Sequence, residues 1–384
     1  MSMQRRDAVS LMVAGAAAAA LPVPAGSRTI TKAGKPMEST IMKGSLPLDA
    51  DYMLAEAPPP PFDWVREGTS YWLFEENGAF AIPRIGVEAE PWSWDNRRFQ
   101  SNFSFADGRI LMRSGQGPMP SVFDKDGKPA ILGGGPITFQ CLKPFERWLA
   151  TFDGMVIDTH VSDQIAMTVD DTKLVPLKYE FELTMAVPPN EQDISPGKFA
   201  TWGKGKRRDA ASIGLGWRFE QMLRGEGEVE VDGERRPAKV VGSRIKRRSV
   251  RTDGLFLRGH CWQAVLFPDG RAAGFEARPV HDDGEDPWNE GFVYQDGKMH
   301  RARATRIPWL RDIVASGEDV SFELESELGT TRIEGATELA TFQLGRDHLW
   351  GLRLQQSGVR YSWDGQTAYG MIERSSWEDM TKFE

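Results

Sequence analysis

Two of the side chains best suited to acid–base chemistry lie in one predicted hairpin in the C-terminal half of the chain, and a third lies near the C-terminus. His260 lies two residues before Trp262, Glu276 follows on the returning segment, and Glu373 lies in a similar aromatic setting near the C-terminus. A carboxyl group buried in apolar surroundings has a raised pKa, and a histidine titrates near neutral pH, so each can hold or deliver a proton. His260, Glu276 and Glu373 are therefore the catalytic candidates, for acid-catalysed hydration, cyclisation or isomerisation. The alternative for each is structural: a hydrogen-bonded histidine inside the fold, or a carboxylate at its surface.

A second set of aromatic and polar residues is suited to holding a ligand. The sequence contains 13 Trp residues. An apolar pocket floored by Trp faces would stabilise a carbocation, although Trp also fills the core of small barrels. Gln263 adjoins Trp262 in the hairpin, Asp95 follows Trp94, and His160 offers a polar group from the N-terminal half. We predict that these five residues contact the ligand.

The hairpin that carries these residues is predicted from its composition and its turn. Residues 255–267 are rich in Phe, Leu, Trp and Val without a helical stripe, and residues 268–271 (Pro-Asp-Gly-Arg) favour a tight turn. Residues 272–278 return as the second strand. If the first and last turn residues pair, Gln263 lies opposite Glu276. A bulge after the turn would shift this register by one residue.

The rest of the chain has the pattern of an antiparallel β protein. Short apolar runs are separated by Asn-Gly and Asp-Gly turns, at the spacing of roughly 8–12 residues that is typical of sandwiches and barrels. Residues 178–186 (KYEFELTMA) alternate most clearly, and residues 188–208 are a loop rich in Gly, Pro and charge. We predict an all-β fold in two domains, residues 63–208 and 209–384, after a proline-rich linker at 26–62.

The N-terminus is predicted to be an export signal rather than part of the fold. Arg5 and Arg6 precede an alanine-rich, weakly apolar run at residues 11–21, and Val-Pro-Ala at 23–25 supplies small residues for a signal peptidase. The pattern over residues 1–25 resembles a twin-arginine signal and predicts a periplasmic or secreted protein. The alternative is an alanine-rich tail on a cytosolic protein. The apolar run is too short to cross a bilayer, so no integral membrane span is expected.

Composition and cysteine usage argue against several classes of function. A net charge of −8 and a pI near 5.4 argue against nucleic-acid binding, because affinity for phosphates needs a basic field. Cys141 and Cys261 lie far apart, and no Cys and His cluster at metal-ligand spacing, so no metal site and no cofactor are expected. A disulfide between the two is permitted after export, but their apolar contexts favour free buried thiols.

Several motifs resemble one group of bacterial proteins. They are Arg218-Phe219-Glu220-Gln221, Val231-Asp232-Gly233-Glu234, Gly259-His260-Cys261-Trp262-Gln263, Leu266-Phe267-Pro268-Asp269-Gly270-Arg271 and Tyr369-Gly370-Met371-Ile372-Glu373-Arg374. This group is similar to the hydroxyneurosporene-synthase (carotenoid 1,2-hydratase) and AttH-like superfamily. The resemblance implies two calycin or lipocalin-like antiparallel β-barrels in tandem, with apolar, terpenoid-like ligands. Neighbouring subgroups carry an Arg-Asp-His-Ser-Trp-Gly motif where this chain has Arg244-Ile245-Lys246-Arg247-Arg248, so their catalytic residues do not transfer directly.

Together these features predict a protein that binds an apolar terpenoid or lipid-like small molecule and hydrates, cyclises or isomerises it. The alternatives are a non-catalytic carrier of hydrophobic ligands and a structural scaffold with filled barrels. An acid–base pair in a cavity would favour the enzyme, a wholly apolar cavity the carrier, and no cavity the scaffold. Nothing in the sequence indicates the oligomeric state.

Overall fold

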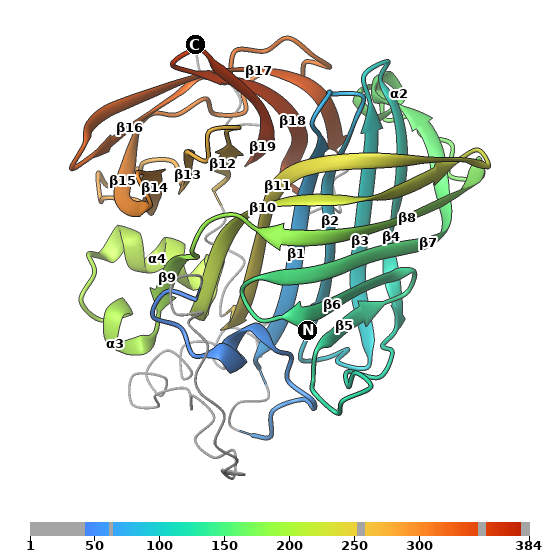
Figure 1. Ribbon diagram of the computed structural model, residues 1–384. Coiled ribbons are helices and arrows are strands. Elements are labelled where there is room, and N and C mark those ends of the chain that lie inside the picture. Colours follow the sequence, from blue (N-terminus) through green and yellow to red (C-terminus); the bar gives the residue numbers. More distant parts are fainter. Residues whose placement is uncertain (1–42, 61–63, 252–257, 345–350, 378–384) are drawn as a thin grey trace, which may run out of the picture.

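The computed structural model describes residues 43–60, 64–251, 258–344 and 351–377, which form two barrels of antiparallel strands lying side by side (Figure 1). The predicted all-β fold of two lipocalin-like barrels is confirmed. The predicted export signal at 1–25 and the start of the predicted linker lie outside the described residues. Among the described residues, no helix is long and apolar enough to cross a membrane.

The first barrel is a ring of eight long strands. The order in the sheet is β4-β3-β2-β1-β11-β10-β8-β7, and β7 pairs again with β4 to close the ring. Short strands β5 (Ile131–Gly134), β6 (Ile137–Lys143) and β9 (Asn190–Ile194) extend this sheet. The ring strands are β1 (Arg66–Glu75), β2 (Phe80–Ala89), β3 (Asn96–Phe105), β4 (Arg109–Pro118), β7 (Arg147–His160), β8 (Leu174–Met185), β10 (Leu215–Val231) and β11 (Glu234–Val250).

The second barrel closes in simple sequence order. Each strand pairs with the next, and the last pairs with the first. The strands are β12 (His260–Leu266), β13 (Ala272–Ala277), β14 (Asn289–Gln295), β15 (Lys298–Arg306), β16 (Phe322–Ser326), β17 (Gly329–Gln343), β18 (Arg353–Trp363) and β19 (Gln366–Ser376). The helical elements are short and lie outside the rings: η2 (Leu48–Asp51), α2 (Val161–Ala166), α3 (Pro196–Phe199) and α4 (Lys204–Ile213).

The chain passes from one sheet to the other between Val250 and His260, later than the boundary that the sequence predicted at 208/209. Strand β11 pairs with β1 over ten residues, from Arg66↔Ser249 to Glu75↔Val240. Without β10 and β11, strands β1 and β8 would be unpaired edges, which folded proteins avoid. Strand pairing between segments so far apart in the sequence leaves no local pattern. The similar succession of strands and turns on each side of residues 188–208 therefore did not mark the boundary between the barrels.

The end of the predicted linker is part of the first barrel. Residues 43–60 cover one end of the ring, and η2 places Asp51 fully buried beneath it. The Asp51 carboxylate accepts hydrogen bonds from the backbone N–H of Phe145 at 2.5 Å and from Nε1 of Trp148 at 3.0 Å, and it pairs with both terminal nitrogens of Arg244 at 2.9 and 3.0 Å. A buried charge matched in this way holds the segment in place.

The hairpin of β12 and β13 forms as predicted, but its register is shifted by one residue. Gln263 lies opposite Phe275, and Trp262 lies opposite Glu276. The turn holds three residues rather than two, because the Phe267 N–H donates to the Arg271 carbonyl at 2.8 Å while Gly270 takes φ +90°. The shift moves Glu276 onto the face that carries His260 and Trp262, and moves Phe275 to the opposite face.

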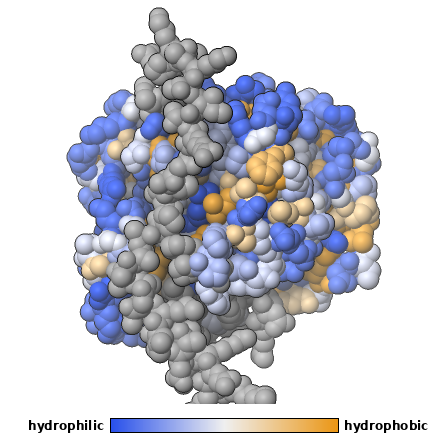
Figure 2. All heavy atoms as spheres, turned by 90° about the horizontal axis from the view of Figure 1, so that it is seen from below, coloured by the Kyte–Doolittle hydropathy of each residue, from blue (hydrophilic) through white to orange (hydrophobic). Residues whose placement is uncertain are grey.

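The three largest apolar clusters among the described residues fill the two barrels and join them. Aromatic side chains such as Tyr71 and Trp148 fill the first barrel, and Phe275 and Phe322 fill the second. A third cluster joins the outer faces of the two barrels, with Trp72 of β1 packed edge-on against Trp262 of β12 at 4.7 Å between ring centroids. On the face of the molecule shown in Figure 2, hydrophobic residues form small groups among hydrophilic ones wherever the surface is not covered by grey atoms.

Candidate functional site

One row of polar side chains crosses the outer face of the second barrel, where that face packs against the first barrel. Glu276, Trp262, Glu373 and Gln356 are register partners on the adjacent strands β13, β12, β19 and β18. Side chains of paired residues in antiparallel strands point to the same face. All four are buried. The row therefore lies within the contact between the barrels rather than inside either one.

His260 is the centre of an acid–base unit in this contact. Its Nδ1 lies 2.6 Å from the Ser375 hydroxyl oxygen, and its Nε2 lies 3.4 Å from Oε1 of Glu373. Burial lowers the pKa of His260. Burial by itself would raise the pKa of Glu373, but Arg84 and His260 outweigh it and hold that pKa far below its usual value. At neutral pH a neutral imidazole therefore donates from Nε2 to an ionised Glu373 and accepts from Ser375 at Nδ1.

Two side chains connect this unit to the first barrel. Arg84 of β2 places Nη1 2.7 Å from Oε2 of Glu373, and Nε2 of Gln356 donates to the same oxygen at 2.5 Å. The Gln356 carbonyl oxygen in turn accepts hydrogen bonds from Asn102 at 2.7 Å and from Gln100 at 3.2 Å, both on β3. The acid–base unit is thus built by both barrels and depends on their docking.

Glu276 belongs to a neighbouring group of ion pairs. Its two oxygens pair with Arg218 at 2.5 Å and with Arg278 at 2.9 Å. Burial would raise the pKa of Glu276, but these two arginines outweigh it and lower that pKa. Glu220 accepts from Arg218 at 3.0 Å and from Nε1 of Trp262 at 3.2 Å, and here burial prevails and raises the pKa.

Glu88 of β2 is surrounded by arginines on the outer face of the first barrel. It forms ion pairs with Arg98 at 2.6 Å, Arg247 at 3.2 Å and Arg66 at 3.4 Å. Burial alone would raise the pKa of Glu88, but the arginines hold it well below its ordinary value. The register partner of Glu88 on β1 is Gly68, where a Cβ atom would come within 2.8 Å of Cγ of Glu88. A glycine at this position therefore makes room for the cluster.

Two adjoining cavities open beside these groups, along the line where the barrels meet. The first has a volume of about 430 Å³ and the second about 330 Å³. They share the lining residues Gln100, Ser114 and Gln343 and so form one cleft. The first cavity is lined by Arg84, Glu88, Arg98 and Gln100 from the first barrel and by Gln343 and Leu354 from the second. Arg84 is thus in contact with both the cleft and Glu373.

The structure brings four of the predicted site residues together: His260, Trp262, Glu276 and Glu373. Gln263 points the other way, into the second barrel, where the Tyr361 hydroxyl donates to its carbonyl oxygen at 2.5 Å. Alternation along β12 explains the difference, because Gln263 follows Trp262 directly.

The other three predicted residues lie away from the cleft. Trp94 is buried in the turn between β2 and β3, and Asp95 beside it is exposed. His160 ends β7 and caps helix α2: its Nδ1 accepts from the Ser162 N–H at 3.2 Å, and its Nε2 lies 3.0 Å from the Asp107 carbonyl. Each of these positions has a local structural explanation.

Sequence reasoning missed Arg84, Glu88 and Ser375. Ser375 could have been found, because it lies two residues after Glu373 on one strand and so shares its face. Arg84 and Glu88 carry no comparable signal, since the strands that bring them to Glu373 and Arg247 are far apart in sequence.

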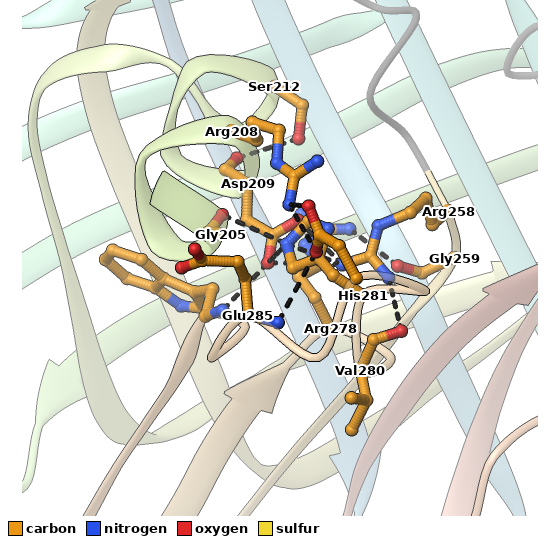
Figure 3. A network of polar contacts seen from close by, with 12 residues as sticks. Gly205, Arg208, Asp209, Ser212, Arg258, Gly259, Arg278, Val280, His281 and Glu285 are labelled. Carbon is orange, nitrogen blue, oxygen red and sulfur yellow. Dashed lines mark hydrogen bonds and ion pairs between the residues drawn. The ribbon is translucent and has the colours of Figure 1, made fainter. Parts of the chain in front are cut away.

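A second polar network braces helix α4 against the second barrel (Figure 3). Asp209, almost fully buried, accepts from the Trp288 N–H at 2.8 Å and from Arg258 at 3.0 Å, and faces Nε2 of His281 at 3.3 Å. Arg208 of α4 also forms an ion pair with Asp283, in the acidic loop after His281. Within the described ranges, no group of three or more His, Cys, Asp or Glu could hold a metal ion. Cys141 and Cys261 are buried free thiols, one in each barrel core.

Comparison with known proteins identifies the architecture. No family model matches the sequence, and neither does any curated protein. Among solved structures, a protein assigned as AttH from Nitrosomonas europaea superposes with a TM-score of 0.52 at 14% identity, over 85% of this chain and 99% of that one. This chain has the AttH-like fold. The suspected resemblance to AttH-like tandem lipocalins is thus confirmed at the level of the fold, which is as far as such an identity reaches.

Two further solved structures superpose on this chain with lower TM-scores. CghA, in complex with Sch210972, matches at 10% identity over 82% of this chain and 89% of its own, with a TM-score of 0.49. Kievitone hydratase from Nectria haematococca matches at 11% identity over 90% of this chain and 98% of its own, with a TM-score of 0.45.

Proposed function

We propose that the protein is an enzyme that binds a small organic molecule in the cleft between the barrels and hydrates, cyclises or isomerises it by proton transfer. The observation that carries this proposal is the chain of contacts from Ser375 through His260 and Glu373 to Arg84, which lines the cleft. The sequence resemblance to the carotenoid hydratase group supports the reaction class. A cleft lined by charged groups favours an enzyme over a carrier of purely apolar ligands.

Each member of this chain has a distinct role. The Ser375 hydroxyl, whose register partner Leu354 lines the cleft, can take a proton from the bound molecule as it gives its own to Nδ1 of a neutral His260. The ionised Glu373 stabilises the imidazolium that results. Arg84 faces the cleft with a fixed positive charge, which stabilises negative charge that develops on an oxygen of the bound molecule. The reacting group is therefore best placed beside Arg84.

The charges of the site favour an anionic intermediate over a carbocation. Arg84 and Arg98 line the cavity and would repel a positive centre. The indole faces expected to stabilise a carbocation are already occupied, since the guanidinium of Arg84 lies 5.4 Å from the Trp72 ring centroid and that of Arg218 lies 5.3 Å from the Trp262 ring centroid. A double bond conjugated to a carbonyl, which passes through an enolate, suits these charges.

The proposal is tested with the protein in its own host. Native mass spectrometry of the purified protein identifies a bound ligand, and extracts are then incubated in D₂O with wild-type protein, His260→Asn or Glu373→Gln. We expect one deuterium on a carbon of the product and a loss of product formation of about 10²–10⁴-fold in each variant, as for removal of a general acid or base. Arg235→Gln, at a side chain 64% exposed on the β10–β11 hairpin, is the control and should keep full activity.

The results separate the two classes of function. Product profiles that are the same with wild type and both variants would contradict the enzyme. If a ligand then co-purifies with all three proteins unchanged, the protein is a carrier.

A further inference from the structure

We propose that the cleft recognises an amphipathic organic anion, whose carboxylate lies between Arg84 and Arg98 and whose apolar body extends along Met112, Met167 and Phe342. This inference rests on the proposed function and names the class of its substrate. It follows from three features of the cleft: a surplus of positive charge at one end, guanidinium donors that face the cavity, and several large apolar side chains at the other end.

The surplus of positive charge lies around Glu88. One carboxylate forms ion pairs with three arginines, Arg66, Arg98 and Arg247. Buried charges in proteins are normally matched, because an unmatched charge in a medium of low dielectric costs several kcal/mol. A second carboxylate, that of Glu90, lies 3.9 Å from Nε of Arg98. Among the described residues, these three arginines therefore share two carboxylates, which leaves one positive charge unmatched.

The pKa values of the buried arginines reflect this excess of positive charge. Burial, together with neighbouring arginines, lowers the pKa of Arg66 and of Arg247 to about 9 and that of Arg251 to about 10. Among the described residues, Nε of Arg247 is buried without a hydrogen-bond partner. An anion in the adjoining cavity would favour the charged form of all three.

Two arginines present donors to the cavity directly. The Arg98 side chain is 47% exposed and uses Nη2 for Glu88, while Arg84 uses Nη1 for Glu373. A guanidinium has five N–H donors, so each retains donors for a further acceptor. A carboxylate suits such donors because it accepts two parallel hydrogen bonds from one guanidinium.

The other end of the cleft carries several large apolar side chains among polar ones. The apolar residues that line the second cavity are Met112, Met167 and Val169 on the side of the first barrel and Phe342 and Leu344 on the side of the second. The polar residues that line it are Gln100, Asn102, Arg113, Ser114, Gln164 and Gln343. Each cavity falls near the lower end of the range of roughly 300–1,000 Å³ that is typical of small-molecule sites. The gathering of methionine and phenylalanine side chains at one end of the cleft, with the Glu88 cluster at the other, suits a molecule with a charged head and an apolar body.

The test compares decanoate with decan-1-ol, which has the same chain length without the charge. Isothermal titration calorimetry with wild-type protein should give an affinity for decanoate at least about tenfold higher than for decan-1-ol, and NaCl should weaken only the decanoate complex. Arg98→Gln should lose most of this preference, and it is expected to fold because the side chain is half-exposed. Arg84→Gln should lose it as well, and Arg235→Gln should keep it.

A further variant examines the apolar end. Met167 is 70% exposed, so Met167→Glu should fold, and it should weaken the binding of both ligands. Equal affinity of the wild type for the two ligands, or an unchanged preference in Arg98→Gln, would overturn the inference.

These results are independent of the test of catalysis. If the wild type binds decanoate no more tightly than decan-1-ol while His260→Asn and Glu373→Gln still abolish product formation, the proposed ligand class is wrong and the proposed enzymatic function stands. If decanoate binds as expected while both variants leave the product profile unchanged, the anion site stands and the enzyme does not.

Discussion

Two groups of buried charges differ in their balance of charge and in their access to a cavity. These two properties distinguish a structural network from a binding site. Inside the first barrel, Asp51 faces one guanidinium, that of Arg244, and its remaining acceptor positions are filled by neutral donors. Between the barrels, Glu88 faces three guanidinium groups beside an open cavity. The first group is balanced and closed, and so contributes to stability. The second is unbalanced and open, and so is suited to receive a ligand.

One strand contributes to both groups. Arg244 and Arg247 are three residues apart on β11, and the alternation of a strand directs them to opposite faces. Arg244 points into the barrel with Lys246, and Arg247 points towards the second barrel. Burial by itself therefore does not distinguish the two roles; the balance of charge around each arginine does.

The largest difference is expected between methionine substitutions at these two arginines. Arg244→Met leaves the fully buried Asp51 without its counter-charge and should lower the free energy of unfolding by about 3–5 kcal/mol. Arg247→Met leaves two arginines paired with Glu88 and should change the free energy of unfolding by about 1 kcal/mol or less. Urea denaturation of both variants measures the contrast, and equal losses would show that the Glu88 cluster is as structural as the Asp51 pair.

A smaller effect is expected on ligand binding from Glu88→Gln. Removal of the carboxylate that pairs with all three arginines leaves more positive charge for an added anion, so decanoate should bind about tenfold more tightly, which is about 1.4 kcal/mol. The affinity for decan-1-ol should not change. Calorimetry that finds weaker binding of decanoate would indicate that Glu88 positions the arginines rather than competing with the anion.

The two regions should also lose stability in different ranges of pH. Lys246 and Arg248 lower the pKa of Glu67, inside the first barrel, to about 2 against the opposing effect of burial. Its contribution is present above the unfolded pKa of about 4.5 and is lost as pH falls towards 2. Burial lowers the pKa of His260, so its contribution is present above 6.5 and is lost as pH falls below that value.

His260→Asn should therefore flatten the dependence of Tm on pH just below 6.5. It should also change the acidic region, because His260 helps to hold the pKa of Glu373 low. Glu67→Gln should flatten only the acidic region. Thermal unfolding between pH 3 and 8 records both, and a Glu67→Gln variant that alters the range just below 6.5 would contradict the assignment.

The smallest effect is expected at the surface. Arg235 pairs with Glu228 on the exposed hairpin of β10 and β11. Exposed ion pairs contribute about 0–1 kcal/mol, so Arg235→Gln should unfold in urea within about 0.5 kcal/mol of the wild type. A larger loss would mean that charges outside the two buried groups also stabilise the fold.

Much of the fold could be predicted from local patterns. The alternation of residues 178–186 lies almost entirely within β8, and the Pro-Asp-Gly turn of the β12–β13 hairpin lies where it was predicted. The register of that hairpin was not predictable, because whether the turn holds two or three residues depends on the conformation of Gly270.

The candidate site was predictable in part. His260, Trp262, Glu276 and Glu373 were predicted to belong to a site between or within the barrels, and they meet on the outer face of the second barrel against the first. The arginines around Glu88 were not predictable, because Arg66 and Arg247 come together only through the pairing of β1 with β11. Local sequence records which face a residue takes along its own strand, but not which strand becomes its neighbour.

The pairing of β1 with β11 has a consequence for biosynthesis. Asp51 and Arg244 are separated by 193 positions, so a nascent chain emerging from the ribosome carries an open β1 edge until nearly two-thirds of the protein has been translated. Contacts of such long sequence separation slow folding. The first ring can close only when β11 emerges, shortly before β12 begins, so the cleft between the barrels is assembled last. Chaperone assistance during translation is therefore expected to protect the early strands.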